Sequence, residues 1–154
     1  MNRPVCSETD IDSRVTWERI INVVVTALEQ EGIRYHLDAS SSLYAHGVEF
    51  DMDDLDVTVE WGKINTAHAL FSQHNPGTVT AAYPPSFRFY IDSREVHVMS
   101  YQSETGIGSN QDRTKVKVAG TEVWCKTIEF YKRNMTPSHR LWGPLHEFMQ
   151  KSVS

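Results

Sequence analysis

The stretch "LDASSSLYAHGVEFDMDDLDVTV", residues 37–59, joins a serine-rich turn, a short helix pattern and a group of aspartates that runs into a strand pattern. Asp54 and Asp56 stand two residues apart, so the alternation of a β-strand places both carboxylates on the same face. Two like charges that close repel each other unless a cation lies between them. Mg²⁺ commonly binds one or two carboxylates together with substrate phosphates. The pattern therefore favours a site for Mg²⁺, or Mn²⁺, at Asp54 and Asp56.

The aspartates also have simpler explanations. A solvated acidic loop is one of them, and we expect Asp51 and Asp53, which precede the strand, to face water. A calcium-binding loop is excluded: counting from Asp51, its glycine position holds Asp56 and its bidentate glutamate position holds Gly62.

The serines just upstream suggest a second part of the same site. Ser40, Ser41 and Ser42 occupy the turn and the first positions of a helix that ends at Gly47. Exposed N–H groups and hydroxyls at a helix start can hold a phosphate, although plain helix capping would use the same residues. A phosphate cradle followed by a metal pair on the next strand supplies the parts needed for metal-assisted phosphoryl or nucleotidyl transfer.

The rest of the chain predicts helices and strands in the order α-β-α-β-α-β-β-β-β-α-α, typical of a mixed sheet with helices packed on it. We expect the first helix to run from Val15 to about Glu31, with Asp12 or Ser13 as its cap and Gly32 after its end. The predicted strands are 33–37, 55–61, two within 86–101 and two within 114–125; the remaining helices are 64–74, 127–135 and 138–152.

Length and composition narrow the classes of protein. A chain of 154 residues favours one domain, which we place at residues 13–154 behind a flexible N-terminus of residues 1–12. The net charge of -5 makes nucleic acid an unlikely partner. No apolar window suits a membrane, and the widely separated Cys6 and Cys125 match no metal spacing, so we expect a cytoplasmic protein with Cys125 in its core.

The block at residues 39–57 resembles the nucleotidyltransferase superfamily of DNA polymerase β type. That family has a pair of small residues, a short helix ending in glycine, and an Asp-x-Asp motif entering a strand. Here Ala39-Ser40 stands for the small pair, His46-Gly47 closes the helix, and Asp54-Leu55-Asp56 is the metal motif. The size is closest to small antibiotic nucleotidyltransferases of lincosamide type and to the minimal nucleotidyltransferases. The resemblance implies a nucleotidyltransferase fold, an ATP or other nucleoside triphosphate substrate, and a phosphate site at Ala39, Ser40 and Ser41.

Two positions depart from the family's pattern. Ala39 replaces a glycine that would let a triphosphate approach the backbone. The third catalytic carboxylate of the family falls on His97, which could act as a base but is a poor Mg²⁺ ligand. Glu95, two residues earlier on the same strand face, is the alternative. Lys132 lies where the family often has a lysine, and it is the preferred basic candidate for binding phosphate.

We therefore expect transfer of AMP from ATP to a hydroxyl of a small molecule or protein, with Asp54, Asp56, and His97 or Glu95 as the catalytic group. A second reading is an inactive nucleotidyltransferase-fold domain that binds a nucleotide or a protein. A third is another metal enzyme in which His97 joins both aspartates around Mn²⁺, Fe²⁺ or Zn²⁺. The acceptor, and whether the chain forms a homodimer, stay open.

Overall fold

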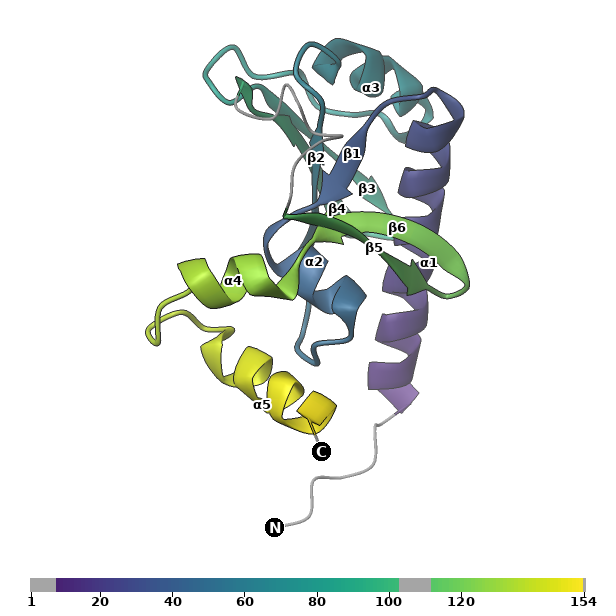
Figure 1. Ribbon diagram of the computed structural model, residues 1–154. Coiled ribbons are helices and arrows are strands. Elements are labelled where there is room, and N and C mark those ends of the chain that lie inside the picture. The colour runs from purple at the N-terminus through teal and green to yellow at the C-terminus, as the bar shows by residue number, and fades with distance from the viewer. Residues whose placement is uncertain (1–7, 103–111, 154) are drawn as a thin grey trace.

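The computed structural model describes residues 8–102 and 112–153, and its elements follow the predicted order (Figure 1). The helices are α1 (Glu8–Gln30), α2 (Ala39–His46), α3 (Ile64–Leu70), α4 (Ile128–Asn134) and α5 (Trp142–Val153), with a 3-10 helix, η1, at Ser72–His74. The strands are β1 (Tyr35–Leu37), β2 (Asp54–Val59), β3 (Ser86–Ile91), β4 (Arg94–Ser100), β5 (Arg113–Val118) and β6 (Thr121–Lys126). The prediction of a mixed sheet flanked by helices is confirmed.

The six strands form a single sheet in the order β3-β4-β2-β1-β6-β5. Strand β2 pairs in parallel with β4 and antiparallel with β1, and β1 pairs in parallel with β6. In the β2–β4 register, Asp54 lies beside Glu95 and Asp56 lies beside His97. Residues that are far apart in the sequence are thus brought to one end of adjacent strands.

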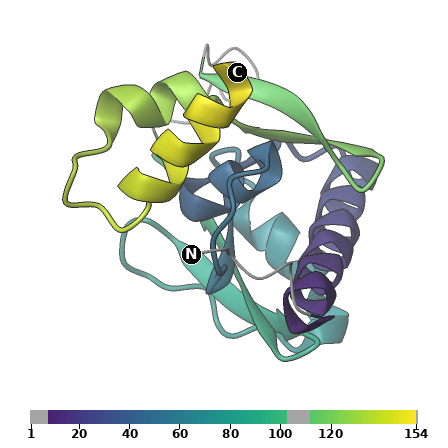
Figure 2. The same cartoon turned by 90° about the horizontal axis from the view of Figure 1, so that it is seen from below.

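Helices α1 and α3 pack on one face of the sheet, and α1 runs alongside the strands (Figures 1 and 2). The main core lies between them and includes Trp17, Ile20, Val57, Ala67 and Val98, each buried. Successive side chains of β2 and β4 point to opposite faces of the sheet. Leu55, Val57 and Val96 therefore lie in the core, and Asp54, Asp56 and His97 lie on the opposite face. Cys125 belongs to this core, as predicted, whereas Cys6 lies outside the described residues.

A second, smaller core joins α2 to the C-terminal helices α4 and α5. Its buried members are Leu43, Val48, Tyr131, Leu141 and Leu145. Figure 2 shows α4 and α5 together on the side of the molecule where α2 lies. None of the helices in the described parts of the chain combines the length and apolarity needed to cross a lipid bilayer.

Some predicted boundaries are wrong. Helix α1 begins at Glu8 rather than Val15, so residues 8–12, which we expected to be flexible, are helical. The first strand covers Tyr35–Leu37 only, because Ile33 still donates its N–H to the Leu28 carbonyl in the turn that ends α1. The last helix begins at Trp142 and not at residue 138. These errors concern the ends of helices and strands, where the pattern of apolar residues alone does not fix the boundary.

Helix α2 is fastened to the end of β6 by side-chain hydrogen bonds. The fully buried Ser42 hydroxyl accepts from the Lys126 N–H at 2.7 Å and donates to the Lys126 carbonyl at 2.9 Å. A ring nitrogen of His46, one turn later, lies 2.7 Å from the same carbonyl. Both polar groups of the Lys126 peptide are therefore satisfied by α2.

Replacing Ser42 by alanine leaves the buried Lys126 N–H without this partner, at a cost of about 1–3 kcal/mol. We expect Ser42→Ala to lower the free energy of unfolding by that amount in urea denaturation. Ser72→Ala, at an exposed position of η1, is the control and should change it by less than about 0.5 kcal/mol. Equal effects of the two substitutions would contradict the fastening role of Ser42.

Candidate metal and nucleotide site

Asp54, Asp56 and His97 form a cluster at the start of β2 and on the neighbouring strand β4. One ligand atom from each of the three lies within 4.8 Å of the other two. Oδ1 of Asp56 is 3.5 Å from Nδ1 of His97, and both side chains are largely buried, at 17% and 18% exposure. Alternation predicted that Asp54 and Asp56 share one face, the family resemblance pointed to His97, and the structure brings the three together.

The electrostatics of the cluster favour a bound cation. The pKa of Asp54 is raised, first by burial and then by the negative charges of Asp56 and Glu95, while His97 acts in the opposite direction. Ionised Asp54 is thus destabilised by its surroundings. A divalent cation would remove this penalty, because it attracts both carboxylates.

The donor set of the cluster also bears on the choice of metal. Two carboxylates suit Mg²⁺, and adding an imidazole nitrogen moves the preference toward Mn²⁺, Fe²⁺ or Zn²⁺. Nδ1 is the ring nitrogen of His97 that lies near Asp56. Its other nitrogen, Nε2, is buried and has no hydrogen-bond partner within the described residues. The residues present therefore fit a divalent cation.

Glu95 lies next to Asp54 in the strand register but is outside the cluster. Its Oε1 is 3.3 Å from Nε of Arg88 and accepts a hydrogen bond of 3.4 Å from the Tyr90 hydroxyl. Both partners come from β3, on the side of β4 away from β2. Of the two candidates for the third position, His97 is the one that contacts an aspartate.

The start of α2 forms the second part of the site. Asp38 accepts the Ala39 N–H at 2.8 Å and the Thr58 hydroxyl at 3.1 Å, which fixes the turn between β1 and α2. Ala39 has a φ of +50°, in the left-handed region that favours glycine. The family pattern's glycine at this position therefore has a conformational reason, which Ala39 meets at some cost in strain.

The three serines have different roles. Ser41 Oγ accepts the Asp56 N–H at 2.8 Å and lies 3.4 Å from the Asp54 carbonyl, so it ties α2 to β2. Ser42 ties α2 to β6, as described above. Ser40 lines a cavity beside the two aspartates and is the serine placed to meet a ligand. The hydroxyls of Ser41 and Ser42 are bonded to backbone groups of neighbouring strands. Their roles are therefore structural, closer to the capping alternative than to binding a phosphate.

A cavity of about 180 Å³ lies between α2, the aspartates and the C-terminal helices. Its walls include Ala39, Ser40, Asp54 and Asp56 on one side, and Tyr131, Met135, His139 and Arg140 on the other. The Arg140 guanidinium is 3.5 Å from a carboxylate oxygen of Asp53, which is 77% exposed as predicted. Arg140 therefore stands at the edge of the cavity, held over the acidic segment.

Sequence reasoning chose Lys132 as the basic residue and missed Arg140. The Lys132 ammonium lies 3.6 Å from Glu129 on the exposed side of α4, and Lys132 is not among the residues that line the cavity. Arg140 precedes α5, and only the packing of α5 against α2 brings it near Asp53. In the sequence, only its positive charge marks Arg140 as a possible phosphate ligand, and many surface residues carry the same charge.

The sequence matches no described protein family and no curated protein sequence. Solved structures do resemble it. A Thermotoga maritima protein proposed to be a nucleotidyltransferase (TM1012) superposes with a TM-score of 0.66 at 16% identity, over 91% of this chain and 94% of that one. ANT(2'')-Ia, solved in complex with adenylyl-2''-tobramycin, gives a TM-score of 0.62 at 14% identity, over 90% of both chains. A solution structure of the antibiotic-resistance factor ANT(2'')-Ia gives 0.60 at 13% identity, over 92% of this chain and 86% of that one. The chain therefore has the nucleotidyltransferase fold.

Because the pKa of Asp54 is raised in the folded protein, its ionisation opposes folding; this penalty begins above the pKa of the unfolded chain and is complete above the folded-state pKa. We expect Asp54→Asn to stabilise the metal-free protein at pH 7. The gain should disappear below about pH 4, where the carboxyl is protonated in the unfolded chain as well. Urea denaturation at both pH values, in the presence of a chelator, checks this. Glu122→Gln, in an exposed ion pair with Lys115, is the control with no such gain.

Proposed function

We propose that this protein transfers a nucleoside monophosphate, AMP from ATP in our preferred form, to a hydroxyl of a small molecule or protein in a reaction that requires a divalent cation. The observation that carries the proposal is the cluster of Asp54, Asp56 and His97, which borders the cavity at the start of α2. The nucleotidyltransferase fold supports it. A reducing cytoplasm suits the free, buried thiol of Cys125.

Each part of the cavity has a task in this proposal. Asp54 and Asp56 hold the cation, which when bound neutralises charge on the triphosphate. Ser40 and the first turn of α2 hold terminal phosphate oxygens. Arg140, from the opposite wall, adds a guanidinium that can bind phosphate oxygens in pairs once it leaves Asp53. His97 takes the third position and can accept the proton of the attacking hydroxyl, because a neutral imidazole is a base near pH 7.

A second function class also has support in the site. Ala39 stands in a left-handed conformation where glycine is favoured, and His97 occupies the position of a family carboxylate. Both features fit a domain that binds a nucleotide or a protein and turns nothing over. Nucleotide binding that depends on a cation, without release of pyrophosphate for any acceptor hydroxyl, would favour this alternative.

Calorimetric titration of ATP with and without Mg²⁺ or Mn²⁺ tests the proposed site. We expect cation-dependent binding that is lost in the Asp54→Asn/Asp56→Asn double variant. Loss of a residue that merely supports a metal ligand costs about 10–100-fold in affinity, and loss of both ligands should cost more.

Asp51→Asn provides a matched control, because it makes the same chemical change in the same segment at an exposed residue outside the cluster. It should leave ATP binding unchanged. Wild-type protein that binds no nucleotide with either cation would rule the proposal out.

His97→Asp tests whether the histidine sets the metal preference. An aspartate there would complete a set of three carboxylates, which suits Mg²⁺, so the affinity for Mg²⁺–ATP should rise relative to Mn²⁺–ATP. The readout is the ratio of the two dissociation constants, with metal analysis of the purified wild type alongside. An unchanged ratio would show that His97 does not contact the cation.

A further inference from the structure

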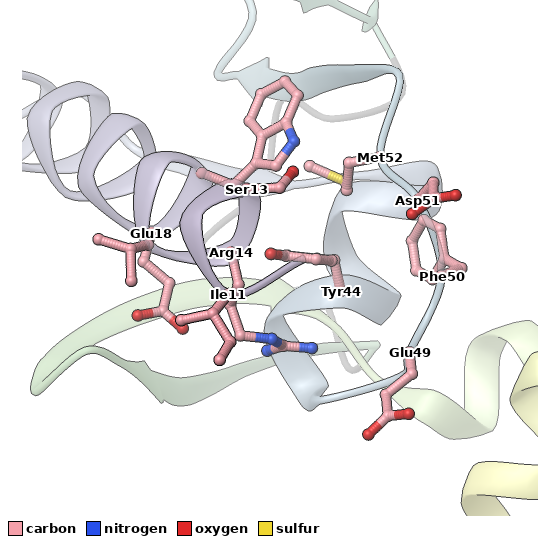
Figure 3. A pocket seen from close by; sticks show the side chains of 11 residues that line it. Ile11, Ser13, Arg14, Glu18, Tyr44, Glu49, Phe50, Asp51 and Met52 are labelled. Atoms are coloured by element: carbon pink, nitrogen blue, oxygen red, sulfur yellow. The ribbon is translucent and has the colours of Figure 1, made fainter. Parts of the chain in front are cut away.

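A second cavity among the described residues lies away from the metal cluster and has no part in the proposed reaction. It has a volume of about 370 Å³, within the range of small-molecule sites. Its walls come from the first turns of α1, from Tyr44 of α2 and from the segment 49–52 (Figure 3). The segment 49–54 separates it from the first cavity: Phe50 and Met52 line this one, and Asp54 lines the other.

The inner wall of this cavity is apolar and rich in rings and sulfur. Trp17, Tyr44, Phe50 and Met52 line it, and Tyr44 and Phe50 meet edge to face with their ring centres 5.9 Å apart. Burial raises the pKa of the Tyr44 hydroxyl, in keeping with this apolar setting. Ile11 and Val15 on the rim are 52% and 58% exposed, so they add apolar surface at the mouth of the cavity. An apolar or aromatic ligand body would cover this surface.

Trp17 adds a hydrogen-bond donor that has no acceptor. The residue is only 2% exposed, and its Nε1 has no hydrogen-bond partner within the described residues. A buried indole N–H normally finds one. Arg94 packs over the Trp17 ring at 5.1 Å and donates to the Ser13 hydroxyl at 3.1 Å, so the indole is held in place. A ligand with a hydroxyl or carbonyl oxygen would satisfy the N–H.

The charges around the cavity are mainly negative. Glu18, Glu49 and Asp51 line it, together with the guanidinium of Arg14, and Arg94, which packs over Trp17, is a second guanidinium nearby. Arg14 is itself directed to the Tyr44 ring, 5.0 Å from its centre. Figure 3 shows Glu18 and Glu49 on different sides of Tyr44, so a ligand above the ring would lie between carboxylates. This balance selects a cation over an anion.

We propose that this cavity binds a small amine: an aromatic or apolar body that carries an ammonium group and a hydroxyl or carbonyl oxygen. The body packs on Tyr44, Phe50 and Met52, the oxygen accepts the Trp17 N–H, and the ammonium faces Glu18 on the α1 side of the cavity. The site is independent of the proposed transfer reaction, and its test needs no nucleotide.

Tyramine and 3-(4-hydroxyphenyl)propionate are matched probes, because they share the phenol and differ in the sign of the charge. The indole N–H resonance of Trp17, identified with Trp17→Phe, serves as the readout in a two-dimensional ¹H–¹⁵N spectrum. We expect tyramine to shift it in a saturable way and the propionate to leave it unchanged. The Trp61 indole, at an exposed position outside the cavity, is the internal reference.

Glu18→Gln should weaken tyramine binding about three- to fivefold, as expected for a partly exposed charge pair. Glu122→Gln, a distant exposed carboxylate, should not change it. Equal shifts by both probes, no shift by tyramine, or an unchanged affinity in Glu18→Gln would overturn the proposal.

Discussion

Two serine hydroxyls hold α2 to strands β2 and β6, and the position of α2 beside the aspartates depends on them. Ser41 bonds the backbone of Asp56, and Ser42 bonds the backbone of Lys126 on β6. A hydroxyl can donate one hydrogen bond and accept another. Each serine therefore bonds backbone groups of β2 or β6 that lie beyond the end of the three-residue strand β1. The start of α2 is thereby set at a fixed height above Asp54 and Asp56.

The same fixed arrangement keeps the three side chains of the acidic cluster close to one another. Asp54 and Asp56 occupy positions dictated by β2, and His97 occupies the position dictated by β4. The strand pairing therefore fixes where the backbone of each of the three lies. The sheet thus keeps the two carboxylates close together. A cation bound between them would offset their repulsion.

The order of elements could be predicted from hydrophobic periodicity, and the pairing of Asp54 with Asp56 from alternation along one strand, whereas the resemblance to the nucleotidyltransferase family pointed to His97. Other features depend on contacts between distant parts of the chain. That Glu95 would be held by Arg88 and Tyr90 requires the register of the β3–β4 hairpin. The place of Arg140 requires the packing of α5 on α2. The serines read equally well as phosphate ligands or as caps, since the sequence does not show which backbone groups lack a partner.

The two walls of the metal-side cavity belong to different cores. The aspartates stand on strands of the main core, whereas Tyr131 and Leu141 belong to the smaller core that α4 and α5 share with α2. The smaller core has few fully buried side chains, so its local opening costs less than global unfolding. The half of the cavity that carries Arg140 can therefore open locally while the strands that hold the aspartates stay folded.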